Sequence, residues 1–196
     1  METRFRIINF ILISFLNINS FAQNPIKETK KYLESQWIEE LLFVSIKQQK
    51  LYHIKNDKII NIYIISSSSY GTGSKAGSNR TPLGLHKVKQ KYGKTTPVNG
   101  KMIGRVFYGE IANIHTDKTR SKTDDITSRI FWLGGMEEGK NKGKGIDSYL
   151  RHIYIHGTSE EGRLGKPASN GCIRMKNKEV IDLYKIIEVG TLVLIL

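Results

Sequence analysis

The chain has 196 residues, with 31 Lys and Arg against 18 Asp and Glu, which gives a formal net charge of +13. Its length suits a single domain with a core of ordinary size, and its one cysteine, Cys172, excludes a fold held by internal disulfides. The charge favours a polyanionic partner, such as anionic lipid, a carboxylate-rich cell wall or nucleic acid. A generally basic protein without a specific anionic partner fits the same charge.

Residues 1–22 have the layout of a secretory signal peptide. Two arginines precede an apolar run over residues 7–16, and small residues follow at Ser20 and Ala22. An uncleaved membrane anchor is the alternative, but the run is about half of the roughly 20 residues that a span needs. We therefore expect export to the periplasm or cell wall, with no stable membrane span after cleavage. Nucleic acid is then not an expected partner.

The next part of the chain is predicted to change from helix to sheet. Residues 23–40 predict a short helical leader, with Pro25 suited to a helix start. From Leu41 three β-rich runs separated by polar turns predict an antiparallel sheet. Residues 66–84 are rich in Ser and Gly and predict a loop. Their glycines miss the spacing of a nucleotide-binding loop, so we expect no such cofactor.

The remaining chain predicts further strands and one helix. Asn177 could cap a helix that ends near Gly190, and a short buried-type strand closes the chain. The sum is a mostly β domain over residues 41–196, with one late helix. The other strand candidates lie at residues 85–88, 105–113, 128–133 and 151–156.

Cys172, in the stretch PASNGCIRM, is a candidate nucleophile. An unpaired cysteine in an exported protein is either incidental or reactive. His156 ends the predicted strand RHIYIH, and Gly157 allows a turn, so the returning loop could bring Cys172 to the imidazole. A thiolate is the nucleophilic form, and a neighbouring imidazole can take the thiol proton and return it to a leaving amine.

Neighbouring groups could complete such a site. No aspartate lies nearby in the sequence, so the carbonyl of Gly157 is the candidate that orients His156. The amides of Gly171 and Cys172 could hold an oxyanion. Arg174 would project to the same side as Cys172 in an extended segment, where its guanidinium suits a substrate carboxylate. Each residue alone also fits a structural role.

A zinc site built from His152, His156 and Cys172 is an alternative. Two histidines four apart on a strand are about 13 Å apart at roughly 3.3 Å per residue, too far for one zinc ion with ligands at about 2 Å. A helix would bring them together, but the alternating isoleucines of HIYIH favour a strand. We therefore expect no metal.

Two segments around the candidate nucleophile have the pattern of a known family. IYIHGT at residues 153–158 is followed by LGKPASNGCIRM at residues 164–175, and then by a helix and a Gly-Thr-hydrophobic strand. With these segments the chain resembles the L,D-transpeptidase catalytic domain family (YkuD type) from about residue 42 to its end. NRTPLGLHKV at residues 79–88 and TSRIFWL at residues 127–133 resemble further segments of the family.

This resemblance implies an L,D-transpeptidase-like β-sandwich and cell-wall chemistry without a cofactor. Members attack the peptide bond before the terminal D-alanine of a peptidoglycan tetrapeptide stem and form an acyl-thioester. A side-chain amine of a second stem then takes the acyl group, which gives a 3-3 crosslink. Acylation of the thiol by carbapenems is a further expectation.

Carried over by position, the family pattern gives the residues of this loop their roles. Cys172 is the nucleophile and His156 its base, oriented by the carbonyl of Gly157. Gly171 and Cys172 supply the oxyanion hole. The substrate site falls on Ser169, Asn170 and Arg174.

One position departs from the family pattern, because Asn170 stands where members usually have histidine before Gly-Cys. Asn170 can hydrogen-bond but cannot titrate, so the departure bears on rate and acceptor choice. A hydrolase with water as acceptor, acting as a carboxypeptidase or detaching a wall-attached protein, is one alternative. A peptidoglycan-binding module without catalysis is another. A sortase is disfavoured, because its T-L-x-T-C sequence is absent.

Overall fold

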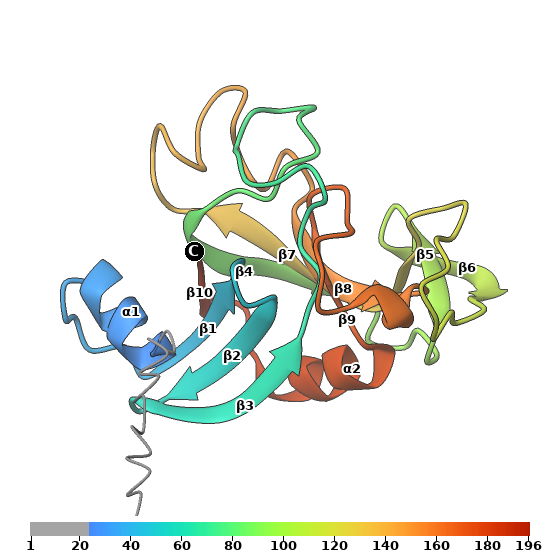
Figure 1. The fold of residues 1–196 in the computed structure, drawn as a ribbon, viewed down its shortest axis with the longest axis horizontal. Helices are drawn as coiled ribbons and strands as arrows, with labels where there is room; N and C mark the ends of the chain where they lie inside the picture. Colours follow the sequence, from blue (N-terminus) through green and yellow to red (C-terminus); the bar gives the residue numbers. More distant parts are fainter. Residues whose placement is uncertain (1–23) are drawn as a thin grey trace, which may run out of the picture.

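The structure, a computed structural model, describes residues 24–196, so the predicted signal peptide over residues 1–22 lies outside the described part. Figure 1 shows the helices and strands. In chain order they are α1 (Pro25–Tyr32), β1 (Glu40–Ser45), β2 (Lys50–Lys55), β3 (Lys58–Ile64), β4 (Gly84–Tyr92), β5 (Gly100–Ile103), β6 (Val106–Ile111), β7 (Ile126–Gly135), β8 (Tyr154–Thr158), the short 3-10 helix η1 (Glu161–Arg163), β9 (Ile173–Met175), α2 (Asn177–Ile186) and β10 (Leu192–Ile195).

The strands form one open sheet with the order β3-β2-β1-β10-β4-β7-β5-β6, and β8 joins β7 to β9. The last strand, β10, lies parallel to β1 in the middle of this order. In Figure 1 the sheet curls, so that β1 to β3 lie on one side of the molecule while β7, β8 and β9 lie on the other. The predicted mostly β fold, with a short first helix and one helix after the Cys172 loop, is confirmed.

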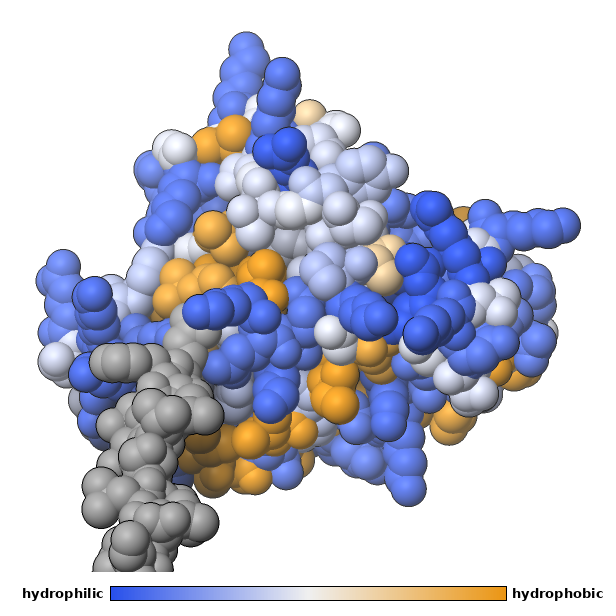
Figure 2. Space-filling model, in the orientation of Figure 1, coloured by the Kyte–Doolittle hydropathy of each residue, from blue (hydrophilic) through white to orange (hydrophobic). Residues whose placement is uncertain are grey.

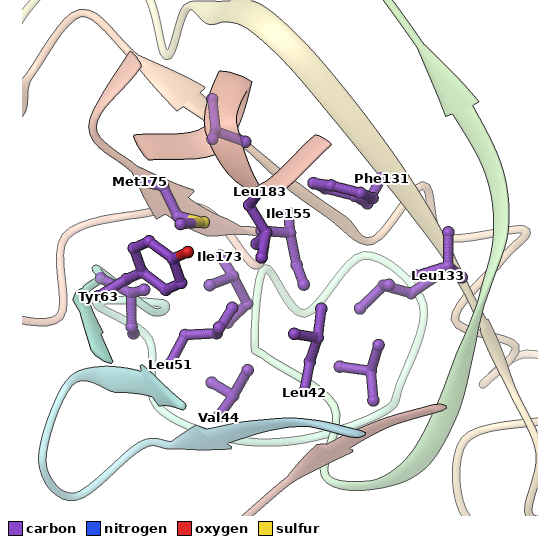
Figure 3. Packing of buried hydrophobic residues seen from close by; sticks show 14 of the residues in the cluster. Leu42, Val44, Leu51, Tyr63, Phe131, Leu133, Ile155, Ile173, Met175 and Leu183 are labelled. Carbon is purple, nitrogen blue, oxygen red and sulfur yellow. The ribbon is translucent and has the colours of Figure 1, made fainter. Parts of the chain in front are cut away.

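The main core lies between these two parts of the sheet. Figure 3 shows Leu42 and Val44 of β1 facing Ile155 and Leu183 across it. The neighbouring side chains of β1 point the other way, into a second cluster that α1 covers. Burial on both faces explains why β1 has an unbroken apolar run instead of the alternation of a half-exposed strand.

Asn177 begins α2 instead of capping it, which corrects the sequence prediction. The N-cap position is Lys176, and no side chain caps the helix there. The Asn177 side chain is buried, and its Oδ1 accepts hydrogen bonds from the hydroxyls of Thr127 and Ser128, both at 2.6 Å. Its Nδ2 donates to the carbonyl of Thr158 at 2.8 Å. Asn177 therefore joins α2 to β7 and β8, the strand that carries His156.

Two predicted strands have different bounds in the structure. The candidate at residues 105–113 is the second arm of the β5–β6 hairpin, and the candidate at residues 151–156 starts and ends later, as β8, which continues through Gly157 where a turn was predicted. Residues 147–152 form turns instead, in which the Ile153 amide donates to the Ser148 carbonyl. This turn brings the start of β8 close to the Cys172 loop.

Hydrophilic side chains cover most of the face shown in Figure 2, and the apolar patches on it are separate. Ile60, Ile62 and Ile64 of the edge strand β3 are exposed large apolar residues. Within residues 24–196, no helix is long and apolar enough to cross a membrane.

Candidate active site

Cys172 directly precedes β9, and His156 lies on the neighbouring strand β8. Strands β8 and β9 are parallel, with His156 opposite Arg174. Cys172 is two positions before Arg174 and contacts the backbone of Tyr154, two positions before His156. Cys172 packs against the cluster that contains the Tyr154 side chain, and Tyr154 shares a face of β8 with His156 because side chains two apart on a strand share a face, so the thiol lies toward the face that carries the imidazole. The register of two short strands thus brings together residues that are sixteen positions apart.

The Cys172 thiol is held by two backbone groups. Sγ donates to the carbonyl of His152 and accepts from the amide of Tyr154, each at 3.3 Å. The residue as a whole is half-buried, but burial of the sulfur raises the pKa of the thiol to about 12, against the smaller opposing effect of the Tyr154 amide. The resting group is therefore a thiol, and it needs a base to become a nucleophile.

His156 has the tautomer that such a base requires. Its Nδ1 lies 2.7 Å from the carbonyl of Gly157, and since a carbonyl can only accept, Nδ1 carries the proton and Nε2 the lone pair. The side chain is buried, and burial lowers the pKa of His156 below its ordinary value, although Asp124 and the Gly157 carbonyl act in the other direction. The imidazole is therefore neutral near neutral pH.

Within the described residues no hydrogen bond joins Sγ to the His156 ring, because the thiol is bonded to His152 instead. The thiol hydrogen has to leave the His152 carbonyl before it can pass to the imidazole. The structure therefore places the pair on one face, with the thiol in a resting orientation.

Ser169 and Gly171 shape the loop before Cys172. Gly171 has φ +125°, a conformation that favours glycine, and its carbonyl accepts from the Thr81 hydroxyl at 2.9 Å. Its amide, predicted to hold an oxyanion, donates to Ser169 Oγ at 3.2 Å. Ser169 Oγ in turn donates to the Cys172 carbonyl at 2.6 Å, and the Ser169 residue is fully buried. Both residues hold the loop, and their contacts with a reacting substrate stay predictions.

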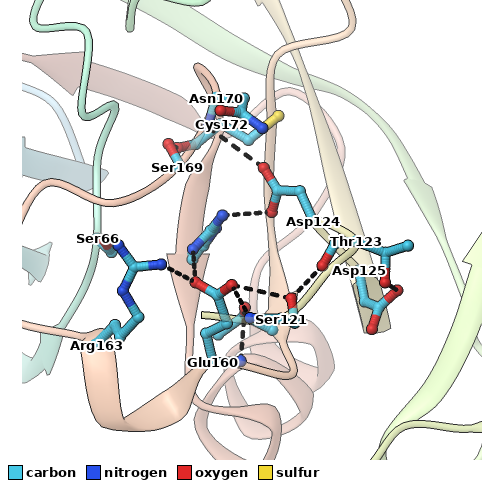
Figure 4. Close-up of polar contacts among 12 residues, drawn as sticks. Ser66, Ser121, Thr123, Asp124, Asp125, Glu160, Arg163, Ser169, Asn170 and Cys172 are labelled. Carbon is cyan, nitrogen blue, oxygen red and sulfur yellow. Dashed lines mark hydrogen bonds and ion pairs between the residues drawn. The ribbon is translucent and has the colours of Figure 1, made fainter. Parts of the chain in front are cut away.

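Arg174 is buried in an ion-pair network, where the sequence suggested an arginine facing substrate. Its Nη2 lies 2.6 Å from Asp124 Oδ1, and its Nη1 lies 2.7 Å from Glu160 Oε2. Arg163 pairs with the same Glu160 oxygen at 2.8 Å. Figure 4 shows this network below Cys172. Because two carboxylates occupy its guanidinium, Arg174 is placed to hold the strand, and a direct substrate contact stays a prediction.

Asp124 is a residue of this site that the sequence analysis missed. It lies on the loop between β6 and β7, and its Oδ2 accepts from the exposed Asn170 amide at 3.3 Å while Oδ1 binds Arg174. One carboxylate thus joins the Cys172 loop to β9 (Figure 4). Forty-eight positions separate Asp124 from Cys172, and the acidic pair at Asp124 and Asp125 was the only signal in the sequence.

Replacing Asp124 with asparagine is expected to loosen the Cys172 loop. A charge-assisted hydrogen bond is roughly twice as strong as a neutral one, so we expect backbone amides of residues 168–172 to exchange about tenfold faster. Hydrogen–deuterium exchange with mass spectrometry measures this. Asp117→Asn on the same loop is the control, because Asp117 accepts only from Thr119 nearby. Equal exchange in both variants would contradict the assignment.

A cavity of about 400 Å³ borders the Cys172 loop. Arg151 and Ile153 line one side, next to the carbonyl and amide that hold Sγ, and Asn170 of the Cys172 loop lines another. Cys172 also packs against an aromatic cluster that contains Trp132. Among residues 24–196, no group of three His, Cys, Asp or Glu side chains is placed to hold a metal ion.

Comparison with known proteins gives the family of the chain. A family model described as the L,D-transpeptidase catalytic domain (YkuD) matches residues 39–195, which is most of the chain. The chain belongs to the L,D-transpeptidase catalytic domain family. The resemblance inferred from the H-G-T and G-C-I-R-M segments is thereby confirmed.

Individual L,D-transpeptidases match over shorter stretches or at low identity. The putative L,D-transpeptidases YqjB and YkuD of Bacillus subtilis are 57% and 51% identical over 53 and 45 residues, which are 26% and 23% of this chain. These stretches span only 28% and 27% of the two relatives. Among solved structures, the L,D-transpeptidase of Xylanimonas cellulosilytica has a TM-score of 0.48 at 17% identity, covering 86% of this chain and 69% of that one. An L,D-transpeptidase of Mycobacterium smegmatis has a TM-score of 0.48 at 14% identity, covering 81% and 58%.

Proposed function

We propose that this protein is an exported L,D-transpeptidase that acts on peptidoglycan tetrapeptide stems in the periplasm or cell wall. The observation that carries the proposal is the pair on the β8–β9 ladder: a lone thiol on the same face as a neutral histidine whose Nε2 is free to accept a proton. Family membership supports the substrate class, and the basic charge suits a carboxylate-rich wall.

The proposed reaction starts with transfer of the Cys172 proton to His156 Nε2. The thiolate attacks the carbonyl carbon before the terminal D-alanine, and backbone amides of the loop stabilise the oxyanion. The C–N bond then breaks, His156 returns its proton to the leaving amine, D-alanine departs, and an acyl-thioester remains. An acceptor amine attacks the thioester, gives a proton to His156, and the new amide forms as Cys172 leaves as a thiolate that takes the proton back.

Incubation with a defined tetrapeptide muropeptide tests this proposal. We expect the protein mass to increase by the acyl group, D-alanine to appear, and crosslinked dimers to form when an amine acceptor is present. Intact-protein and product mass spectrometry read all three. An unchanged protein mass with every stem and with a carbapenem would contradict the proposal.

Hydrolysis is the second candidate, because the thioester can also pass to water. It would give the same protein adduct and D-alanine but a tripeptide in place of a dimer. A peptidoglycan-binding module without catalysis would instead bind sacculi equally well with Cys172→Ala and yield no products in either form. The exposed Asn170, where the family usually has histidine, motivates both comparisons.

A further inference from the structure

A stem peptide presents free carboxylates, and a cleft that selects its terminal residue needs a cation to meet one of them. The sequence suggested Arg174 for this role. In the structure Arg174 is buried, with its two terminal nitrogens on Asp124 and Glu160. A substrate carboxylate would have to displace an existing ion pair in the protein interior, at a large cost in free energy. Another cation near Cys172 is therefore needed.

Among residues 24–196, no carboxylate pairs with the guanidinium of Arg151, which interacts electrostatically with Cys172. It donates to the carbonyls of Gly73 and Arg80 at 3.1 and 2.7 Å and contacts Ser78 Oγ at 3.5 Å, and all three acceptors are neutral. Burial lowers the pKa of Arg151, while its electrostatic interaction with Cys172 acts in the opposite direction. Hydrogen bonds to neutral groups fix the guanidinium in place and leave its full charge available to a ligand.

The position of Arg151 suits a group next to the reacting carbonyl. It directly precedes His152, whose carbonyl accepts from Cys172 Sγ at 3.3 Å. Arg151 also lines the cavity of about 400 Å³, which reaches Asn170 of the Cys172 loop. A peptide end bound in this cavity would therefore lie against the guanidinium and next to the loop that carries the nucleophile.

The wall that carries Arg151 is held firmly. His86 Nε2 lies 3.0 Å from the hydroxyl of Ser148, and burial lowers the pKa of His86 to about 4, so its ring stays neutral. Asp147 lines the same cavity, and its Oδ1 accepts the amides of Tyr149 and Leu150 at 2.8 and 3.1 Å. The cavity therefore offers a cation and an anion on one rigid turn, which suits a carboxylate with an ammonium group beside it.

Arg105, in the turn between β5 and β6, is the rival cation near this site. Its guanidinium lies 4.4 Å from the centre of the Trp132 ring and donates to the Tyr154 hydroxyl at 3.2 Å. It does not line the cavity that reaches Asn170. Stacking on the indole gives Arg105 a structural role, which leaves Arg151 as the better placed residue.

We propose that Arg151 binds a substrate carboxylate in the cavity beside Cys172 and thereby selects peptides with a free carboxylate next to the reacting group. This inference rests on the proposed function. The carboxylate has two possible sources, the terminal D-alanine of the donor stem and the amino-acid centre of the acceptor amine.

The test compares each ligand with its carboxamide. Calorimetry measures the binding of a donor tetrapeptide and of its C-terminal amide to Cys172→Ala, in which no reaction can occur. The same measurements are made on the double variant that also carries Arg151→Gln. Acceptor amino acids and their amides are compared in the same way. We expect the carboxylate form to bind roughly 10- to 100-fold more tightly than the amide, and Arg151→Gln to remove most of that preference.

The ligand for which Arg151→Gln removes the preference for carboxylate over amide, donor tetrapeptide or acceptor amino acid, is the source of the carboxylate that Arg151 binds. Arg80→Gln is the control, because it removes the same charge from the loop that Arg151 contacts and is expected to leave the preference unchanged. A merely structural role of Arg151 would weaken both forms equally and keep their ratio. The inference would be overturned if Arg151→Gln left the ratio of carboxylate to amide affinity unchanged for both donor and acceptor ligands. It would also be overturned if Arg80→Gln removed that ratio.

Turnover of the wild type separates this result from the proposed function. If the carboxylate preference depends on Arg151 but no acyl adduct ever forms, the cavity assignment stands and transpeptidation fails. If adducts form while Arg151→Gln leaves the preference for carboxylate ligands unchanged, transpeptidation stands and the cavity assignment fails.

Discussion

Replacing His156 with glutamine is expected to abolish acylation of Cys172 by tetrapeptide stems at neutral pH. Burial raises the pKa of the thiol to about 12. Without a base, roughly one molecule in 10⁵ would then carry a thiolate at neutral pH. Glutamine preserves the approximate size of the side chain but cannot take a proton. The rate of adduct formation, followed by intact-protein mass spectrometry, measures the effect.

The pH dependence of that rate separates a base from a packing residue. Burial lowers the pKa of His156 below its ordinary value, so the wild-type rate should rise in mildly acidic buffer, as the imidazole loses its proton, and then level. In His156→Gln the rate should instead climb about tenfold per pH unit through the alkaline range, since only free thiolate reacts. If His156→Gln lowered the rate of adduct formation by the same factor at every pH, the assignment of His156 as the base would be contradicted.

Two matched variants complete this experiment. His115→Gln replaces a histidine on the loop before β7 and is expected to keep the wild-type profile. Cys172→Ala removes the only thiol in the chain and is expected to show no adduct at any pH. An adduct in Cys172→Ala would place the nucleophile elsewhere.

The sequence was informative where local patterns decide the structure. The alternating isoleucines around Tyr154 predict a strand, and β8 is present there, but it continues through Gly157 to Thr158, so the turn predicted at Gly157 is wrong. The chain returns over residues 159–172 to the parallel strand β9, and Cys172 directly precedes that strand. The family pattern follows the same local segments, which is why the candidate pair could be named before the fold.

Long-range pairing explains what the sequence could not predict. Arg174 was placed by its proximity to Cys172, but its side chain meets carboxylates from two other segments, Asp124 and Glu160. Asn177 looked like a helix cap, because asparagine favours that position, yet the hydroxyls of β7 satisfy its side chain instead. Both outcomes depend on segments that approach the site only in the folded chain.

The largest expected effect on stability comes from replacing Arg174 with methionine. The side chains of Arg174 and Glu160 are each 3% exposed, so removing the guanidinium leaves a buried carboxylate with one partner fewer and frees Asp124. Breaking a buried pair by removing one partner costs about 3–5 kcal/mol. Urea denaturation measures the free energy of unfolding, and Arg163→Met is the control.

Arg163 binds the same Glu160 oxygen but is 24% exposed, and Arg174 remains when it is removed. We therefore expect Arg163→Met to cost about 1 kcal/mol or less. Equal losses in the two variants, or a loss below about 1 kcal/mol in Arg174→Met, would show that the network does not hold β9.

The loss in Arg174→Met should also depend on pH. Burial alone would raise the pKa of Glu160, but hydrogen bonds from Ser121 and the charge of Arg174 outweigh it and hold that pKa below its ordinary value. A lowered carboxyl pKa stabilises the fold at pH values above the pKa of the unfolded chain, and the stabilisation is lost as the pH falls through the folded pKa. The difference between wild type and variant should therefore be largest at neutral pH, shrink as the pH falls below about 4.3, the ordinary pKa of a glutamate in the unfolded chain, and be lost as the pH falls through the lower folded pKa. A difference that stays constant down to strong acid would assign the stability to the packing of the Arg174 side chain and not to its charge.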